Sequence, residues 1–388
     1  MFSNRTNWKL THNRLTEALE QVRSSGAHVL DLTISNPTRA GLHYDASQIL
    51  KSLASPQAMD YDPQPNGLPS ARAAVADYYR AEHGINLDPE CLLLTTSTSE
   101  GYSFVFRLLC NPGDELLVPK PSYPLFEFLA DLQDVKLVPY PLIYDHGWQM
   151  DFPSLQNAVT KCTRGVVVVH PNNPTGSYVH QEEQRSLNRF CREHELALIA
   201  DEVFLDYAHD REKGQSFSAN QEVLTFTLSG VSKVSALPQM KLAWIVTSGP
   251  AADVEAAQAR LEVIADTYLS LNAPIQCATP ALLDQRKTIQ PQLLNRVRGN
   301  LTELDRQLAA QKSCQRLNVE GGWYAVLRVP VAQTDEELAI DLLRRKSVLL
   351  HPGHFYDFPS DGYLVLSLIT RKDEFTEGIK RLLELVST

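Results

Sequence analysis

The chain has 388 residues, which is enough for about two or three domains and a large buried core. With 43% hydrophobic and 21% charged residues, its composition excludes a disordered or fibrous protein. The net charge of −10 argues against binding to nucleic acid or to an anionic membrane, and no apolar run approaches the ~18 residues of a membrane-spanning helix.

The cysteines are few and widely separated along the chain. None of them belongs to a Cys-x-x-Cys pair, so we predict neither a disulfide framework nor a metal site built from thiolates. The N-terminus, MFSNRTNWKL, contains no apolar stretch of the kind that directs secretion. Together these features predict a cytoplasmic protein without a metal ion.

The first elements expected along the chain are a helix over residues 12–24 and a short apolar segment over 30–38. From about residue 91, short β-rich runs alternate with amphipathic helices, for example over 99–110, 181–194 and 251–270. The predicted strands are 91–96, 115–119, 135–140, 165–170, 196–201, 223–229 and 242–248. Their nearly continuous Val, Leu and Ile residues predict a mostly parallel sheet with helices on both faces.

The pattern changes after Ala273. A long polar helix is expected over about 276–312, and shorter strands and helices over 323–386 complete a smaller α+β unit. We therefore predict an α/β fold with a large domain of residues 46–275. The small domain combines residues 1–45 with residues 276–388, because the first of these segments is too short to fold alone.

Polar side chains follow five of the predicted strands at their carboxyl ends. In open parallel sheets, ligands bind at this edge, where loops and helix N-termini meet. We therefore expect a hydroxyl cluster, an aromatic ring, an amide, a carboxylate and an amine to face one cleft. These groups come from Thr96–Thr98, Tyr123, Asn172–Asn173, Asp201 and Lys233.

The lysine and the aspartate indicate the chemistry of this cleft. A desolvated lysine can form a Schiff base with a carbonyl, as in enzymes that use pyridoxal 5′-phosphate (PLP). An aspartate paired with the pyridine nitrogen keeps that nitrogen protonated, so the ring can accept electrons. Phosphate binds at a helix N-terminus, and Thr96–Thr98, Ser232 and Lys241 could supply the surrounding hydroxyls and a cation.

An ordered set of motifs covers nearly the whole chain. They are LTISNPT (32–38), YDPQPNGLPSAR (61–72), TSTSEG (96–101), NPGDELLVPKPSYP (111–124), NNPTG (172–176), ADEVF (200–204), SGVSKVSALPQMKLAW (229–244) and PGHF (352–355). This series resembles the class I/II, aspartate-type aminotransferase family of fold-type I PLP-dependent enzymes. The resemblance implies PLP as cofactor, the PLP-transferase fold of type I, and ping-pong transfer of an amino group between an amino acid and a 2-oxo acid.

The resemblance also implies roles for single residues. Lys233 would form the Schiff base and move the proton, and Asp201 would pair with the pyridine nitrogen. Asn173 would bind the cofactor's O3′ and the substrate carboxylate, while Tyr123 would stack on the ring. The phosphate ligands would be Ser97, Thr98, Ser232 and Lys241. Tyr61 would reach the phosphate of the partner subunit, which implies a homodimer with shared active sites.

Three positions depart from the family pattern. Phe204 replaces a tyrosine that donates to O3′, so we expect the Schiff base to keep its proton to higher pH. Gly230 stands where relatives often have a phosphate-binding serine. Val365 replaces the arginine that holds the substrate carboxylate, and Arg371 is the nearest substitute, unless it is a solvated charge at the start of the last helix. Ser35 is expected near the same group.

Two other functions share these residues. A PLP-dependent lyase, such as a carbon–sulfur β-lyase, or a decarboxylase would use the same cofactor contacts. A non-catalytic PLP-binding regulatory protein is the second alternative, and the intact Lys233 and Asp201 argue against it. In the favoured interpretation the partners are an amino acid, a 2-oxo acid and a second copy of the chain, with no nucleic acid and no membrane.

Overall fold

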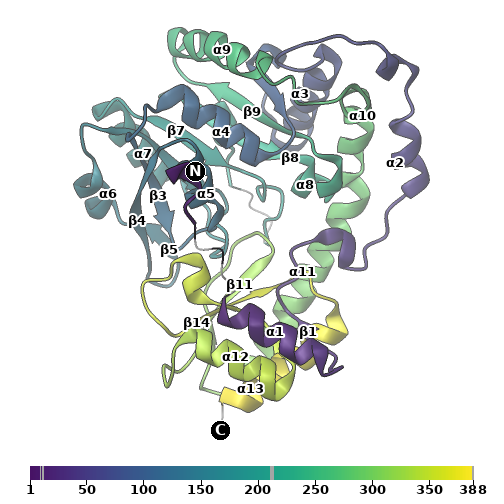
Figure 1. The fold of residues 1–388 in the computed structure, drawn as a ribbon, viewed down its shortest axis with the longest axis vertical. Helices are drawn as coiled ribbons and strands as arrows, with labels where there is room; N and C mark the ends of the chain where they lie inside the picture. Colours follow the sequence, from purple (N-terminus) through teal and green to yellow (C-terminus); the bar gives the residue numbers. More distant parts are fainter. Residues whose placement is uncertain (9, 11–12, 210–213, 387–388) are drawn as a thin grey trace.

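The computed structural model describes residues 1–386 apart from 9, 11–12 and 210–213. Its largest sheet has eight strands in the order β2-β9-β8-β7-β6-β3-β4-β5 (Figure 1). Their bounds are β2 Leu92–Thr95, β3 Glu115–Lys120, β4 Lys136–Tyr144, β5 Trp148–Met150, β6 Thr163–Val169, β7 Ala197–Asp201, β8 Thr225–Gly230 and β9 Ala243–Ser248. Only β9 and β5 run against the direction of the others, so the predicted mostly parallel sheet is confirmed.

Both faces of this sheet are covered by helices. Val167 and Val169 of β6 pack into a core with α4, α5 and α9, whereas the alternate residues Val166 and Val168 pack into a second core with α6 and α7. This arrangement explains why the strand sequences are apolar throughout. The helices of this part are α2 Ala46–Ser52, α3 Pro69–His83, α4 Thr98–Leu109, α5 Leu125–Leu132, α6 Phe152–Ala158, α7 Gln181–Glu193, α8 Val231–Val234 and α9 Ala251–Asp266.

A second, antiparallel sheet of four strands has the order β10-β11-β14-β13. Its elements and their neighbours are β10 Gln315–Arg316, β11 Tyr324–Arg328, β13 His351–Pro352, β14 Tyr363–Ser367, α12 Asp335–Lys346 and α13 Lys372–Val386. Near it, α1 (Arg14–Ser24) packs on α12, and β1 (Leu30–Asp31) pairs in parallel with β12 (Val348–Leu349). Residues 14–31 therefore lie with the C-terminal part of the chain, whereas the N-terminus lies beside α5, where Trp8 packs edge-on against Phe128 (Figure 1).

The long helix predicted over 276–312 is two helices, α10 (Ala273–Asp284) and α11 (Arg286–Leu308). At the break, the buried Arg286 turns back to donate to the carbonyl oxygen of Leu283 at 2.9 Å and to Glu82 at 3.0 Å. The polarity pattern predicted one continuous helix because it does not record this buried ion pair. The predicted domain boundary at 275/276 falls inside α10, and the division into two domains stays a proposal.

His170, which follows β6, predicts how stability depends on pH. Its Nδ1 accepts the backbone N–H of Val179 at 2.9 Å and its Nε2 donates to the carbonyl oxygen of Gln215 at 3.1 Å, so the buried neutral ring is satisfied. Burial lowers the pKa of His170 from 6.5 to about 3. Below pH 6.5 the unfolded state alone takes up the proton, so this residue should remove about 1.4 kcal/mol of stability per pH unit down to the folded pKa.

Denaturant unfolding at pH 7 and pH 5 measures this effect. The wild type should lose about 2 kcal/mol more between the two values than His170→Gln does. His146→Gln is the matched control, because that ring is fully exposed beside Asp145 and should leave the pH difference unchanged. Equal losses in the wild type and in His170→Gln would contradict the assignment.

Candidate active site

The predicted polar residues meet at a cavity of about 450 Å³ at the carboxyl ends of β6, β7 and β8. Among the residues that line it, seven were predicted from the sequence: Ser35, Thr98, Tyr123, Asn173, Asp201, Ser232 and Lys233. Ser97, Lys241, Tyr61 and Arg371, which were also predicted, do not line it. The positions of residues after strand ends thus predicted several of the residues that line the cavity.

Asp201 ends β7 and is held by two hydrogen bonds. The Tyr102 hydroxyl donates to Oδ2 at 3.0 Å, and the backbone N–H of Val203 donates to Oδ1 at 3.1 Å. Burial raises the pKa of Asp201, while these two bonds and the nearby Lys233 oppose the rise. The sequence reasoning missed Tyr102, although it lies one helical turn after Thr98 on α4 and so faces the same side.

Lys233 lies on the short helix α8, directly after β8, and is nearly buried. Its Nζ is 5.6 Å from the ring centre of Phe204 and 5.5 Å from that of Trp323. Burial between these rings lowers the pKa of Lys233, and Asp201 opposes the shift. The Tyr207 hydroxyl donates to the Lys233 carbonyl oxygen at 2.6 Å and fixes the backbone of α8. A lysine in these surroundings is inclined towards the neutral, nucleophilic amine.

Asn173 contributes a buried amide to the cavity. Its Oδ1 has no hydrogen-bond partner within the described part of the chain, although the residue is only 8% exposed. A buried polar atom without a partner is costly, so a polar ligand at this point would satisfy it. The neighbouring Asn172 is used differently, because its Oδ1 accepts the Thr175 hydroxyl within the loop at 3.0 Å.

The N-terminus of α4 and the start of α8 form one end of the cavity. Thr98, Ser99 and Ser232 line it there, with hydroxyls next to the free N–H groups of a helix start, which suits a phosphate. Ser97 is instead the N-cap of α4, with its Oγ accepting the backbone N–H of Glu100 at 3.2 Å. Lys241 has an exposed side chain in this single subunit and lies outside the lining residues.

Close strand packing explains the glycine at position 230. A Cβ atom there would lie 2.9 Å from both the Leu242 carbonyl oxygen and the Ala243 Cβ on β9. A serine would therefore require the two strands to move apart. This chain cannot place a hydroxyl at position 230 without such a shift, and Ser232 is the nearest serine that lines the cavity.

Among the described residues, no arginine lines the cavity in which the substrate carboxylate is expected. Val365 is 1% exposed and packs in the core beneath the second sheet. Arg371 lies outside the cavity, with a side chain 57% exposed and its Nε 3.5 Å from Asp373. Ser35 does line the cavity, and the basic lining residues within the described structure are Lys233 and His351. The sequence reasoning mentioned no role for the lining rings of Tyr324, Phe355 and Tyr356.

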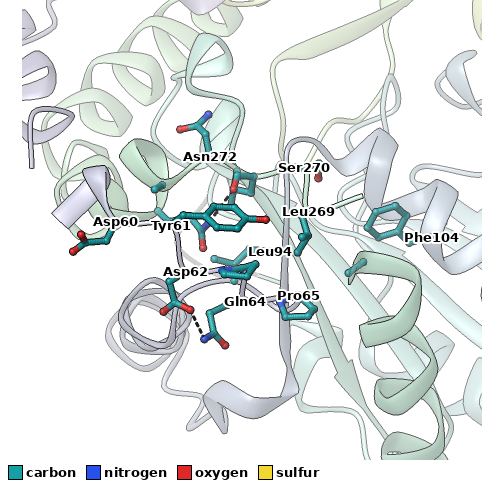
Figure 2. Close-up of a pocket in the computed structure, with 16 residues that line it drawn as sticks. Asp60, Tyr61, Asp62, Gln64, Pro65, Leu94, Phe104, Leu269, Ser270 and Asn272 are labelled. Atoms are coloured by element: carbon teal, nitrogen blue, oxygen red, sulfur yellow. Dashed lines mark hydrogen bonds between the residues drawn. The ribbon is translucent and has the colours of Figure 1, made fainter. Parts of the chain in front are cut away.

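Tyr61 lies far from these residues in the chain's own fold. It is 85% exposed and lines a separate pocket of about 170 Å³ with Leu94, Leu269 and Ser270. Figure 2 shows its ring above Leu94, with Asp62 and Gln64 hydrogen-bonded to each other beside it. Tyr61 therefore does not line the cavity of its own subunit.

Phe204 supports a spectroscopic prediction. The ring lies beside Lys233 and offers no hydroxyl. Phe204→Tyr would add a hydroxyl that can donate to the cofactor's O3′. In the PLP-loaded protein, we expect the pKa of the lysine's Schiff base to fall by about one unit, because the added donor stabilises the deprotonated form. A pH titration of the visible absorbance measures it, and an unchanged or raised pKa would contradict the prediction.

Comparisons with known proteins agree on one family. The chain matches the model of the family described as aminotransferase class I and II over residues 27–382. It is 26% identical to the glutamate-pyruvate aminotransferase AlaA of Haemophilus influenzae, over 96% of this chain and 93% of that protein. It is 28% identical to an alanine aminotransferase of Mycobacterium tuberculosis, over 93% and 86% of the two chains.

Solved structures give the same result for the fold. An aminotransferase from Escherichia coli superposes with a TM-score of 0.86 at 25% identity, covering 100% of this chain and 98% of that one. An alanine aminotransferase from Pyrococcus furiosus superposes with a TM-score of 0.89 at 21% identity, covering 100% of both chains. These similarities confirm the fold predicted from the motifs.

Proposed function

Because the chain belongs to the class I and II aminotransferase family, whose members depend on PLP, we propose specific roles for its residues in amino transfer between an amino acid and a 2-oxo acid. The protein is a PLP-dependent aminotransferase by this membership. The observation that carries the residue-level proposal is that Lys233 and Asp201, both half-buried, line the same cavity.

The cavity suits PLP by its chemistry. A partnerless buried amide at Asn173, a held carboxylate at Asp201 and hydroxyls at a helix start are the groups that a phenolic pyridine with a phosphate requires. When bound, PLP supplies an electron-accepting ring that stabilises negative charge at the substrate Cα. We propose that Asp201 holds the ring nitrogen, Asn173 the ring oxygen, and Thr98, Ser99 and Ser232 the phosphate.

Lys233 has the properties of the proton carrier. Because burial favours its neutral form, Nζ can act first as a nucleophile towards a carbonyl and later as a base at the substrate Cα. Phe204 and Trp323 keep water from Nζ on two sides, and Tyr207 fixes the backbone that carries it. Tyr123, at the mouth of the cavity, is proposed to stack on the ring.

Tyr61 requires a second subunit in this proposal. It is exposed in the single chain and lies in a separate pocket (Figure 2). We propose a homodimer in which Tyr61 reaches the phosphate of the partner's site. Mixed dimers of Lys233→Ala and Tyr61→Phe chains test it, because such a dimer would contain one intact site and should regain activity that neither variant has alone.

We propose a cytoplasmic location because the cysteines form no disulfide in the structure. All six are free in the structure, which fits a reducing compartment. Among the described helices, none is long and apolar enough to cross a membrane. Fractionation of cells that make the protein at native levels tests the proposal, and recovery outside the cytoplasm would contradict it.

The reaction itself is tested by a half-reaction. Single amino acids, starting with alanine and glutamate because the relatives' names include them, are added to the yellow PLP-loaded protein without an oxo acid. We expect one donor to bleach the colour and to release one equivalent of its oxo acid. Continuous release of ammonia or carbon dioxide would instead indicate the lyase or the decarboxylase, and failure to take up PLP would indicate a non-catalytic protein.

A further inference from the structure

The cavity offers few groups that could hold an anion of the substrate. Within the described structure, its basic lining residues are Lys233 and His351, and its remaining walls are largely rings and hydroxyls. Lys233 serves the amine chemistry, and Thr98, Ser99 and Ser232 lie at the end proposed for phosphate. An acidic group elsewhere in the cavity would therefore meet His351 as its only other basic partner.

His351 reaches the cavity from the second sheet. It lies on β13, directly opposite Val365 of β14 in the antiparallel register. Residues directly opposite each other place their side chains on the same face of a sheet. Since Val365 is apolar and buried, the imidazole is the polar group that this strand pair presents to the cavity.

The imidazole is held so that one nitrogen remains for a ligand. Nδ1 lies 3.1 Å from the Tyr356 hydroxyl, and the rings of Phe355 and Tyr356 lie 5.7 and 5.9 Å away. When Tyr356 donates to Nδ1, Nε2 carries the hydrogen and becomes a donor. The structure gives Nε2 no hydrogen bond among the described residues. Burial lowers the pKa of His351, and the nearby Asp31 carboxylate raises it. A bound anion would also raise the pKa of His351.

We infer that His351 binds the carboxylate of the amino-acid substrate through Nε2, in a cavity that no guanidinium of the described residues lines. This inference rests on the proposed function, because it assumes a substrate with a carboxylate. One imidazole nitrogen makes one hydrogen bond, whereas a guanidinium makes two in a fixed fork. The preference for a carboxylate over an uncharged group should therefore be modest, about tenfold.

Two unreactive probes measure this preference without turnover. They are 3-phenylpropanoate and 3-phenylpropanamide, which share an aromatic body suited to the ring-lined walls and differ only in charge. Each is titrated by calorimetry into the PLP-loaded protein. The wild type should bind the carboxylate about tenfold tighter than the amide. In His351→Ala the ratio should fall to about one while the affinity for the amide changes less than twofold.

His354→Ala is the matched control. His354 lies three residues further on the same segment, is exposed and does not line the cavity, so its removal should leave the ratio as in the wild type. His351→Gln keeps an N–H donor without a titrating ring and should retain part of the preference. It also keeps the inference testable if the alanine variant does not fold or does not bind PLP.

Three results would overturn the inference: no preference in the wild type, a wild-type ratio in His351→Ala and His351→Gln, or an equal loss of affinity for both probes. The last result would mean that His351 only supports the cavity wall. These outcomes are separate from those of the half-reaction, because the probes carry no amine. Amino transfer with an unchanged probe ratio refutes His351 alone, and a probe ratio that depends on His351 without amino transfer refutes the proposed function alone.

Discussion

Replacing Lys233 with alanine should reduce amino transfer by at least about 10³-fold, the largest effect expected of any single substitution. The variant loses both the nucleophile and the base, and no other lysine lines the cavity in the described structure. Asp201, Asn173 and the hydroxyls at the helix start remain, so PLP should still bind, though without a covalent link.

Borohydride reduction followed by mass spectrometry separates these two effects. The wild type should gain the mass of the reduced cofactor on the peptide that contains Lys233, and Lys233→Ala should gain none. Lys287→Ala is the control, because this exposed lysine pairs with Asp284, does not line the cavity and should behave as the wild type. A covalent adduct in Lys233→Ala, or activity within tenfold of the wild type, would show that another amine does the chemistry.

The centre of the site could be predicted because its residues follow strands. In a parallel sheet, Asn173, Asp201 and Lys233 come to one edge whatever the details of the connections, so their sequence positions alone bring them together. The apolar strands and most of the helices could also be predicted, from the alternation of β-rich runs with amphipathic stretches. The break between α10 and α11 could not be predicted, because it is confined to one residue, Gln285, within a continuous polar pattern.

The walls of the cavity could not be predicted in the same way. Tyr324 comes from the second sheet and Trp323 directly precedes its strand β11, and their approach to Lys233 depends on how the two sheets pack, which no local pattern records. For Arg371 the sequence left two alternatives, a substitute for the missing arginine or a solvated charge at the start of the last helix. The structure agrees with the second alternative, because Arg371 lies beside Asp373 with a side chain 57% exposed.

Asp201→Asn should have the second largest effect, a loss of roughly 10²- to 10³-fold in kcat. Asparagine has nearly the same shape: its Oδ1 can accept the N–H of Val203, and its Nδ2 can donate to the Tyr102 oxygen, so the fold and PLP binding should be preserved. Only the negative charge is lost, and with it the protonated state of the ring nitrogen on which electron withdrawal depends.

Tyr102→Phe provides a graded test of the same charge. The Tyr102 hydrogen bond lowers the pKa of Asp201, whereas burial raises it. Removing the hydrogen bond should therefore raise the pKa of Asp201. The carboxylate forms only above its pKa, so the acid limb of the kcat profile should move to higher pH, with a loss of roughly tenfold near the wild-type limb. Asp201→Asn should instead lose activity at every pH. If both variants lowered kcat equally without a shift of the acid limb, Asp201 would act by shape and not by charge.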